Sequence, residues 1–73
     1  MKITNAAEFG AAIRKRRKAQ GYTQGAIAEF TGFSVSFISD LERGKETAEL
    51  GKAILLANLL GLDVGVTPRG ERS

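Results

Sequence analysis

Apolar residues recur every three or four positions along most of the chain, which is the period of an amphipathic helix. The stretches that carry this pattern are residues 6–20, 24–30, 35–43 and 48–60. A glycine that can end a helix follows each stretch within two residues. Residues 62–67 instead alternate apolar and polar side chains, as a half-buried strand does. The pattern predicts four or five short helices, then one short strand and a polar tail at residues 68–73.

Residues that favour helix caps stand at each predicted start. Asn5 precedes the first helix, and Glu8 three residues later completes a capping-box pattern. Thr23 and Ser34 stand in the same position before the second and third helices, and Thr47 before the fourth. These caps support the four boundaries independently of the apolar period.

Each predicted helix has one stripe that it can bury. In the first helix, Phe9, Ile13 and Arg17 fall at positions i, i+4 and i+8, and two alanines widen the stripe. The predicted core residues of the other helices are Ile27, Ala28, Phe30, Phe37, Ile38, Leu41, Leu50, Ala53, Ile54, Ala57 and Leu60. We therefore expect an all-α bundle with a single domain at residues 1–67, the last six of which form the strand.

Residues 23–45 are the most informative segment, because they predict two short helices joined by a tight turn at Gly32. This is the shape of a helix-turn-helix, which places its second helix in the major groove of DNA. The exposed face of that second helix is small and mostly uncharged; it consists of Val35, Ser36, Ser39, Asp40 and Arg43. Small hydroxyls can pair with several base edges, and a valine can touch a thymine methyl group.

The same face has a simpler interpretation, in which Ser36 and Ser39 only solvate an exposed helix. The flanking Gly32 and Gly44 favour the base-reading interpretation, because they delimit a helix of the length that a helix-turn-helix requires. Asp40 fits less easily, since phosphates repel a carboxylate. It either accepts a hydrogen bond from a cytosine amino group or orients a neighbouring arginine.

Five consecutive cations, at residues 14–18, cannot all face one partner because a helix turns about 100° per residue. Arg17 lies on the apolar stripe of its helix and needs a buried carboxylate, which Glu42 can supply from the edge of the third helix. We predict a structural Arg17–Glu42 ion pair. The other four cations are interpreted as a solvated face that attracts DNA at long range, with direct DNA contacts as the alternative.

Candidate phosphate contacts lie at helix ends. Thr23 and Gln24 begin the second helix, where free N–H groups and the helix dipole favour an anion. Arg43 and Lys45 flank Gly44 beyond the third helix. The alternative for each residue is simple capping or solvation, and for Thr23 the two roles are compatible.

Apolar residues outside the core stripes predict a homodimer. Leu55, Leu56 and Leu59 fall on the side of the fourth helix opposite its core stripe, where a monomer would expose them. The strand has no ladder partner within the chain, and its apolar residues are Leu62, Val64 and Val66. A second copy could pair with this strand across a two-fold axis and cover the leucines. The alternative is a frayed tail.

Composition narrows the possible functions. The 73 residues include neither cysteine nor histidine, which excludes disulfides, thiolate metal sites and the usual general base. No nucleophile–base pair or glycine-rich phosphate loop is visible, so we expect no enzymatic activity, no cofactor and no metal site. The net charge of +3 suits a polyanionic partner. No apolar run approaches about 18 residues and no signal peptide is recognisable, so we expect a cytoplasmic protein that does not enter the membrane.

From about residue 9 to residue 62 the chain resembles the XRE-type helix-turn-helix family, which includes the lambda and 434 repressors and Cro. The residues that carry the resemblance are Arg17, Thr23, Gln24, Ile27, Ala28, Gly32, Ser34, Ile38, Ser39 and the run at 41–45. The resemblance implies a lambda-repressor-like fold and a transcriptional repressor that binds a palindromic operator in double-stranded DNA. It implies that Ser34, Val35, Ser36 and Ser39 touch base edges and that Thr23, Gln24 and Lys45 hold phosphates. The chain departs from the family in having no Gln, Asn or Arg among its leading base-reading positions.

Residues 60–64 and the strand after them look similar to the HipB-type antitoxins of this family. In those proteins a terminal strand pairs between subunits, and the dimer represses its own operon while it binds a HipA-type kinase toxin. The resemblance thus implies an antitoxin that autoregulates its operon. Two alternatives stay open: a stand-alone or phage-type regulator, and a protein-interaction module that has lost DNA binding.

Overall fold

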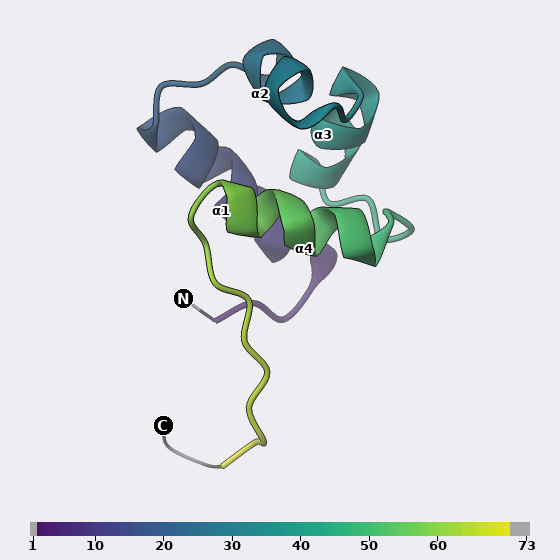
Figure 1. Ribbon diagram of the computed structural model, residues 1–73. Coiled ribbons are helices and arrows are strands. Elements are labelled where there is room, and N and C mark those ends of the chain that lie inside the picture. Colours follow the sequence, from purple (N-terminus) through teal and green to yellow (C-terminus); the bar gives the residue numbers. More distant parts are fainter. Residues whose placement is uncertain (1, 71–73) are drawn as a thin grey trace.

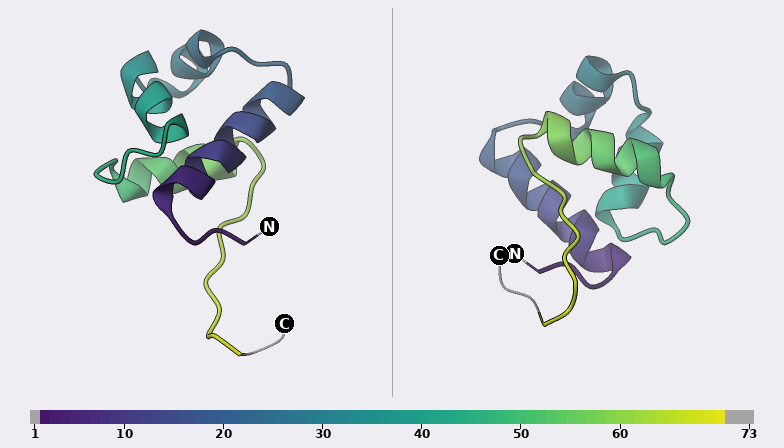
Figure 2. Two further views of the ribbon diagram at one scale, coloured as in Figure 1. Left: turned by 180° about the vertical axis from the view of Figure 1, so that it is seen from behind. Right: turned by 60° about the horizontal axis from the view of Figure 1, so that its bottom comes forward.

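The computed structural model describes residues 2–70 of the chain, and these residues contain four helices and no strand. The helices are α1 (Ala6–Ala19), α2 (Gln24–Thr31), α3 (Val35–Glu42) and α4 (Leu50–Leu59). In Figure 1, α2 and α3 lie together at the top of the molecule, and α1 and α4 lie below them. The views of Figure 2 agree that α1 and α4 face each other beneath this pair. The predicted all-α helix-turn-helix architecture is confirmed.

Three of the four predicted caps form. The side-chain oxygens of Asn5, Thr23 and Ser34 accept hydrogen bonds from backbone N–H groups three residues later, over 2.8–3.0 Å. Each bond satisfies an N–H group that has no partner within its helix. The Glu8 carboxylate, however, accepts from the backbone N–H and the hydroxyl of Thr4, not from the backbone of Asn5 as in a capping box.

The predicted start of the fourth helix is wrong. Helix α4 begins at Leu50 with Glu49 at its N-cap position, and no side chain caps it. Thr47 lies in a turn before the helix. In this turn, the backbone N–H of Ala48 donates to the carbonyl of Lys45. The cap pattern failed because this turn occupies the residues that the apolar period had included in the helix.

One core joins the four helices. Its buried apolar residues are Ile13, Ile27, Ile38, Leu41, Ala53, Leu56, Ala57 and Leu60. Two predicted core residues lie at the surface, since Phe30 is 76% exposed and Leu50 is 71% exposed. Phe33, in the turn between α2 and α3, packs against the core. Leu50 is exposed because α4 presents Leu56 to the core instead.

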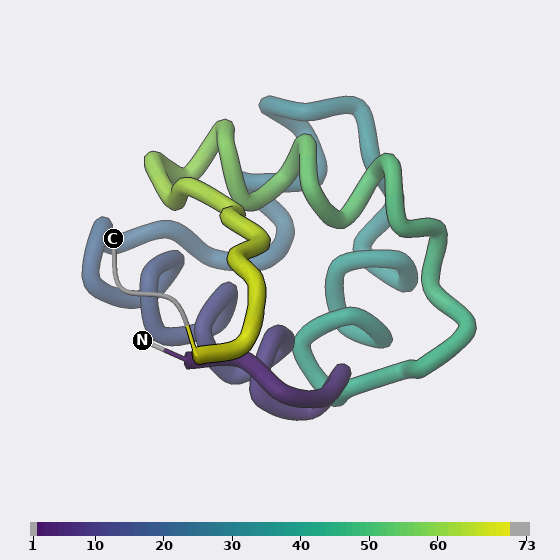
Figure 3. Tube along the Cα trace, turned by 90° about the horizontal axis from the view of Figure 1, so that it is seen from below, coloured from purple at the N-terminus to yellow at the C-terminus, as the bar shows by residue number. Residues whose placement is uncertain are grey.

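The last described segment does not form the predicted strand. Leu62 donates its backbone N–H to the carbonyl of Ala57 over 2.8 Å and packs against the core, but Val64 and Val66 are exposed. A strand needs a neighbouring backbone with which to exchange hydrogen bonds. Residues 2–70 of one chain offer it none, so pairing across a dimer stays a prediction. Figure 3 shows this segment passing the N-terminal residues below the bundle. The end of the predicted tail, residues 71–73, lies outside the described residues.

Candidate DNA interface

Helix α3 presents the predicted reading face at the surface. Val35 is 47% exposed, Ser36 is exposed, and Ser39 is half-buried. On the opposite side, Ile38 and Leu41 lie in the core. The helix is therefore fixed by its apolar side, while its outer side carries small groups. Such a helix fits a major groove about 12 Å wide.

The residues at the helix starts are partly engaged by the fold. Ser34 is exposed and its hydroxyl accepts from Phe37 N over 3.0 Å, while the hydroxyl of Thr23 accepts from Ala26 N over 3.0 Å. A hydroxyl has one donor and two acceptor positions, so each residue keeps a donor for a base edge or a phosphate oxygen. Capping and DNA contact are compatible at both positions.

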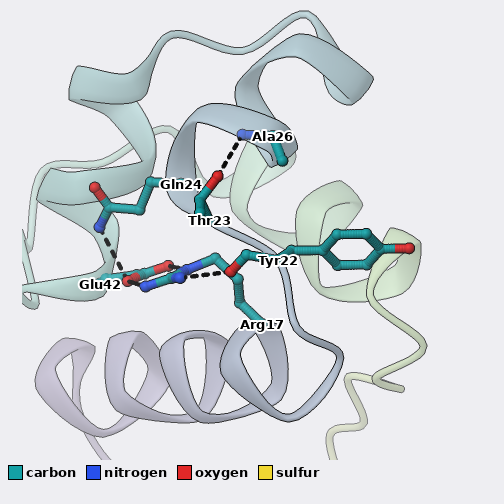
Figure 4. Close-up of polar contacts among 6 residues, drawn as sticks. All are labelled: Arg17, Tyr22, Thr23, Gln24, Ala26 and Glu42. Atoms are coloured by element: carbon teal, nitrogen blue, oxygen red, sulfur yellow. Dashed lines mark hydrogen bonds and ion pairs between the residues drawn. The ribbon is translucent and has the colours of Figure 1, made fainter.

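The structure brings Arg17 and Glu42 together in a buried, bidentate pair (Figure 4). Arg17 Nε donates to Glu42 Oε2 over 2.7 Å, and Arg17 Nη2 donates to Glu42 Oε1 over 2.8 Å. The exposed fractions of the two side chains are only 8% and 2%. Arg17 Nη1 also donates to the Tyr22 carbonyl over 2.8 Å, so the guanidinium ties together α1, α3 and the loop before α2.

Charge and hydrogen bonding keep this pair ionised. Burial acts to raise the pKa of Glu42, but hydrogen bonds from Arg17 and Gln24 and the charges of Arg17 and Arg14 outweigh it, so the pKa lies below its ordinary value. The hydrogen bonds to Glu42 likewise raise the pKa of Arg17. The arrangement positions helices and leaves no free group for acid–base chemistry.

Gln24, a predicted phosphate contact, also hydrogen-bonds to this pair. Its Nε2 donates to Glu42 Oε1 over 3.1 Å, and the residue is half-buried (Figure 4). The bond links the first residue of α2 to the last residue of α3. Only its second amide hydrogen and its backbone N–H are left for a phosphate, so Gln24 serves the arrangement of the two helices as well.

Asp40, Arg43 and Lys45 form a charged cluster where α3 ends, and we call it the Asp40 cluster. Arg43 Nη2 donates to Asp40 Oδ1 over 2.8 Å, and Lys45 Nζ lies 3.5 Å from Asp40 Oδ2. The hydrogen bond from Arg43 is the main cause that lowers the pKa of Asp40, and the charge of Lys45 adds to it. Of the two roles considered for Asp40, the structure places it beside the arginine.

Two hydrogen bonds between α1 and the end of α4 could not be predicted from the sequence. Arg16, predicted as part of a solvated face, is half-buried and donates its Nε to the Leu60 carbonyl over 2.8 Å, so that prediction is wrong for this residue. Gln20 Nε2 donates to the same oxygen over 3.1 Å. They satisfy a carbonyl at the end of α4, 44 and 40 residues away.

Gly10 is buried, and a Cβ there would overlap the backbone of Leu41 and Glu42. The absence of a side chain at this position lets α1 approach α3.

The leucines predicted for a dimer interface divide into two groups. Leu55 and Leu59 are 49% and 48% exposed, but Leu56 is fully buried and belongs to the core. The assignment of Leu56 to an interface is wrong, because α4 turns that residue toward the other helices. Leu62 is half-buried against the core, whereas Val64 and Val66 are 43% and 96% exposed.

The described residues hold no cluster of three or more His, Cys, Asp or Glu side chains that could bind a metal ion. Likewise, none of the helices within residues 2–70 is long and apolar enough to cross a membrane.

These features define a helix-turn-helix protein. Residues 13–66 match the family model described as Helix-turn-helix. Over 71 residues the chain is 38% identical to an uncharacterized HTH-type transcriptional regulator, y4mF, of Sinorhizobium fredii, a match that covers 97% of this chain and 93% of that protein. The chain therefore belongs to the helix-turn-helix family, of XRE type, and the resemblance seen in the sequence is confirmed.

A solved structure agrees with this fold. A chain of the HipB–O4 20mer complex superposes with a TM-score of 0.83 and covers 94% of this chain and 97% of that one. The two sequences are 22% identical, so the likeness concerns the fold.

Proposed function

We propose that the chain is a homodimeric repressor that binds a specific sequence of double-stranded DNA, with α3 in the major groove. The observation that carries this proposal is the outer face of α3, where Val35, Ser36 and Ser39 are accessible. The start of α2 and the cations after α3 flank this face, at positions suited to contact the two adjacent phosphate backbones. In this account the α3 side chains read bases, while Thr23 and Lys45 fix the register.

Exposed apolar side chains support the dimer. Leu55 and Leu59 lie on one exposed face of α4, and Val64 and Val66 are exposed in a segment that finds no strand partner within residues 2–70. A second copy related by a two-fold axis would cover these residues and place two α3 helices on one side of the assembly. Two half-sites about one DNA turn apart, 34–36 Å, would then be read together.

The proposal is tested on the reading face itself. The double variant Ser36→Glu/Ser39→Glu places two carboxylates against the DNA and should abolish binding to the preferred duplex. The matched control, Ala11→Glu/Lys15→Gln, makes the same change of net charge on an exposed part of α1 and should weaken binding only slightly. If the two double variants bind equally well, α3 does not read the DNA. If neither they nor the unmodified chain bind, the protein-interaction module becomes the better account.

Within this class, the finer role that we propose is an antitoxin. It would bind a HipA-type kinase toxin and repress its own operon. The likeness of fold to HipB and the resemblance of residues 60–64 to the HipB-type antitoxins support it. Size-exclusion chromatography of the chain mixed with a HipA-type kinase tests this role directly. Elution as one complex supports the antitoxin, and separate elution favours a stand-alone or phage-type regulator.

A further inference from the structure

Asp40 is the one carboxylate on the outer face of α3, and both cations of the Asp40 cluster are turned toward it. Its side chain is 33% exposed, whereas those of Arg43 and Lys45 are 74% and 52% exposed. The backbone also joins the three residues, because Lys45 N donates to the Asp40 carbonyl over 3.0 Å. The carboxylate lies on the helix and is partly covered, while the two cation side chains are the more exposed members of the cluster.

We propose that Asp40 determines specificity by competing with DNA phosphates for Arg43 and Lys45, an inference that rests on the DNA-binding function proposed above. A carboxylate and a phosphate accept hydrogen bonds from the same charged donors. With Asp40 present, the cluster carries a net charge of +1 instead of +2 in the region that would face the DNA backbone. Binding to DNA of arbitrary sequence is weakened, and the base contacts of α3 must supply a larger share of the affinity.

The geometry favours competition over a direct contact of Asp40 with a base. Each carboxylate oxygen already faces a cation, Arg43 over 2.8 Å and Lys45 at 3.5 Å, so a cytosine amino group would have to share its acceptor oxygen with a cation. The hydrogen bond from Arg43 is the main cause that lowers the pKa of Asp40, and it favours the charged form of the carboxylate. Arg43 has further N–H groups, so it can bridge the carboxylate and a phosphate but cannot serve both with its full charge.

The experiment compares Asp40→Asn with Asp63→Asn on a 20-base-pair duplex of mixed sequence, as a function of salt concentration. The two substitutions change the net charge equally, and Asp63 is exposed and forms no ion pair within residues 2–70. Each additional phosphate contact should steepen the slope of log affinity against log salt concentration by about 0.9. The affinity gained by the variant should therefore be roughly eightfold larger at about 0.1 M salt than at 1 M. We expect Asp40→Asn to gain at least one such contact and Asp63→Asn none.

Each outcome decides between the proposals. Equal affinities of the two variants would overturn the competition but leave DNA binding intact, and weaker binding by Asp40→Asn would show that Asp40 itself contacts the DNA. If no variant and not even the unmodified chain binds any duplex at low salt, the DNA-binding function fails and the competition fails with it. Thermal melting of Asp40→Asn, expected to be unchanged, shows that the variant folds.

A second comparison separates competition for the cations from simple repulsion of phosphates by Asp40. Asp40→Asn is introduced into the Arg43→Gln/Lys45→Gln variant, where no cation remains for the carboxylate to hold. Competition predicts that Asp40→Asn then tightens binding no more than Asp63→Asn does in the same background. A gain as large as in the unmodified chain would overturn the proposal, because repulsion alone would explain it.

Discussion

The substitution Glu42→Ala tests the buried ion pair that holds α1 to α3. It leaves the Arg17 guanidinium with only the Tyr22 carbonyl as partner, in a site where its side chain is 8% exposed. Breaking a buried pair by removing one partner costs about 3–5 kcal/mol. A domain of 73 residues is stabilised by roughly 4–11 kcal/mol in total. The variant should therefore lose a large part of its free energy of unfolding.

The assay is urea unfolding followed by circular dichroism, with thermal melting as a second measure. At about 4–8 °C per kcal/mol for a domain of this size, the melting temperature should fall by roughly 12–40 °C. The control is Glu49→Ala, which removes an exposed 2.9 Å pair with Lys52 and should cost less than about 1 kcal/mol. A loss for Glu42→Ala no larger than for the control would refute the reasoning.

The double variant Arg17→Met/Glu42→Leu separates the charge from the packing. Replacing both ions of a buried pair by apolar residues is often neutral, because the desolvation cost of the charges disappears with their attraction. The double variant should recover most of the stability that Glu42→Ala loses, although the Tyr22 carbonyl and the Gln24 amide lose a partner. If it is as unstable as the single variant, the loss reflects packing and not a stranded charge.

Four further predictions follow from the same contacts. Gly10→Ala should cost about 1–3 kcal/mol in urea unfolding because its Cβ would overlap carbonyl groups at the end of α3, whereas Gly51→Ala, with open space around it, should be neutral or stabilising. The pKa of Glu42 is lowered in the fold, so the unfolded chain binds more protons in acid than the folded chain does. The stability due to this group is therefore complete above its ordinary pKa of about 4.5 and is lost as the pH falls below that value. Unfolding between pH 7 and pH 3 should show a steeper loss for the unmodified chain than for the double variant that lacks the ion pair, and equal slopes would contradict the assignment. Lys45→Ala should weaken binding to all DNA sequences alike and make the salt slope shallower by about one unit, so an altered base preference would exclude a backbone contact. Leu59→Glu should shift the chain to monomer in sedimentation velocity without unfolding it, and an unchanged dimer would remove α4 from the interface.

Contacts that follow from helical periodicity or from local spacing could be predicted from the sequence. Arg17 and Glu42 each fall on an apolar stripe, so helical periodicity alone implied that the two charges meet inside the fold. The caps Asn5, Thr23 and Ser34 act within three residues of themselves, and such local bonds are visible in sequence spacing.

For α4, the apolar pattern does not determine which side of the helix faces the core. It is apolar on nearly all sides, so several rotations about its axis bury a similar number of apolar side chains, and the phase that buries Leu50 could not be distinguished from the phase that buries Leu56. Distant contacts that no apolar stripe marks were equally inaccessible. Gly10 and the pair of Arg16 with Leu60 acquire their roles only from backbone that folds against them.

The most direct test of the central claim is selection of binding sites by the unmodified chain from a pool of randomised duplexes, followed by sequencing and a salt titration of the best site. The account predicts a palindrome whose half-sites are about one turn apart, with an affinity that falls steeply as salt rises. Failure to enrich any sequence would contradict sequence-specific binding by this chain.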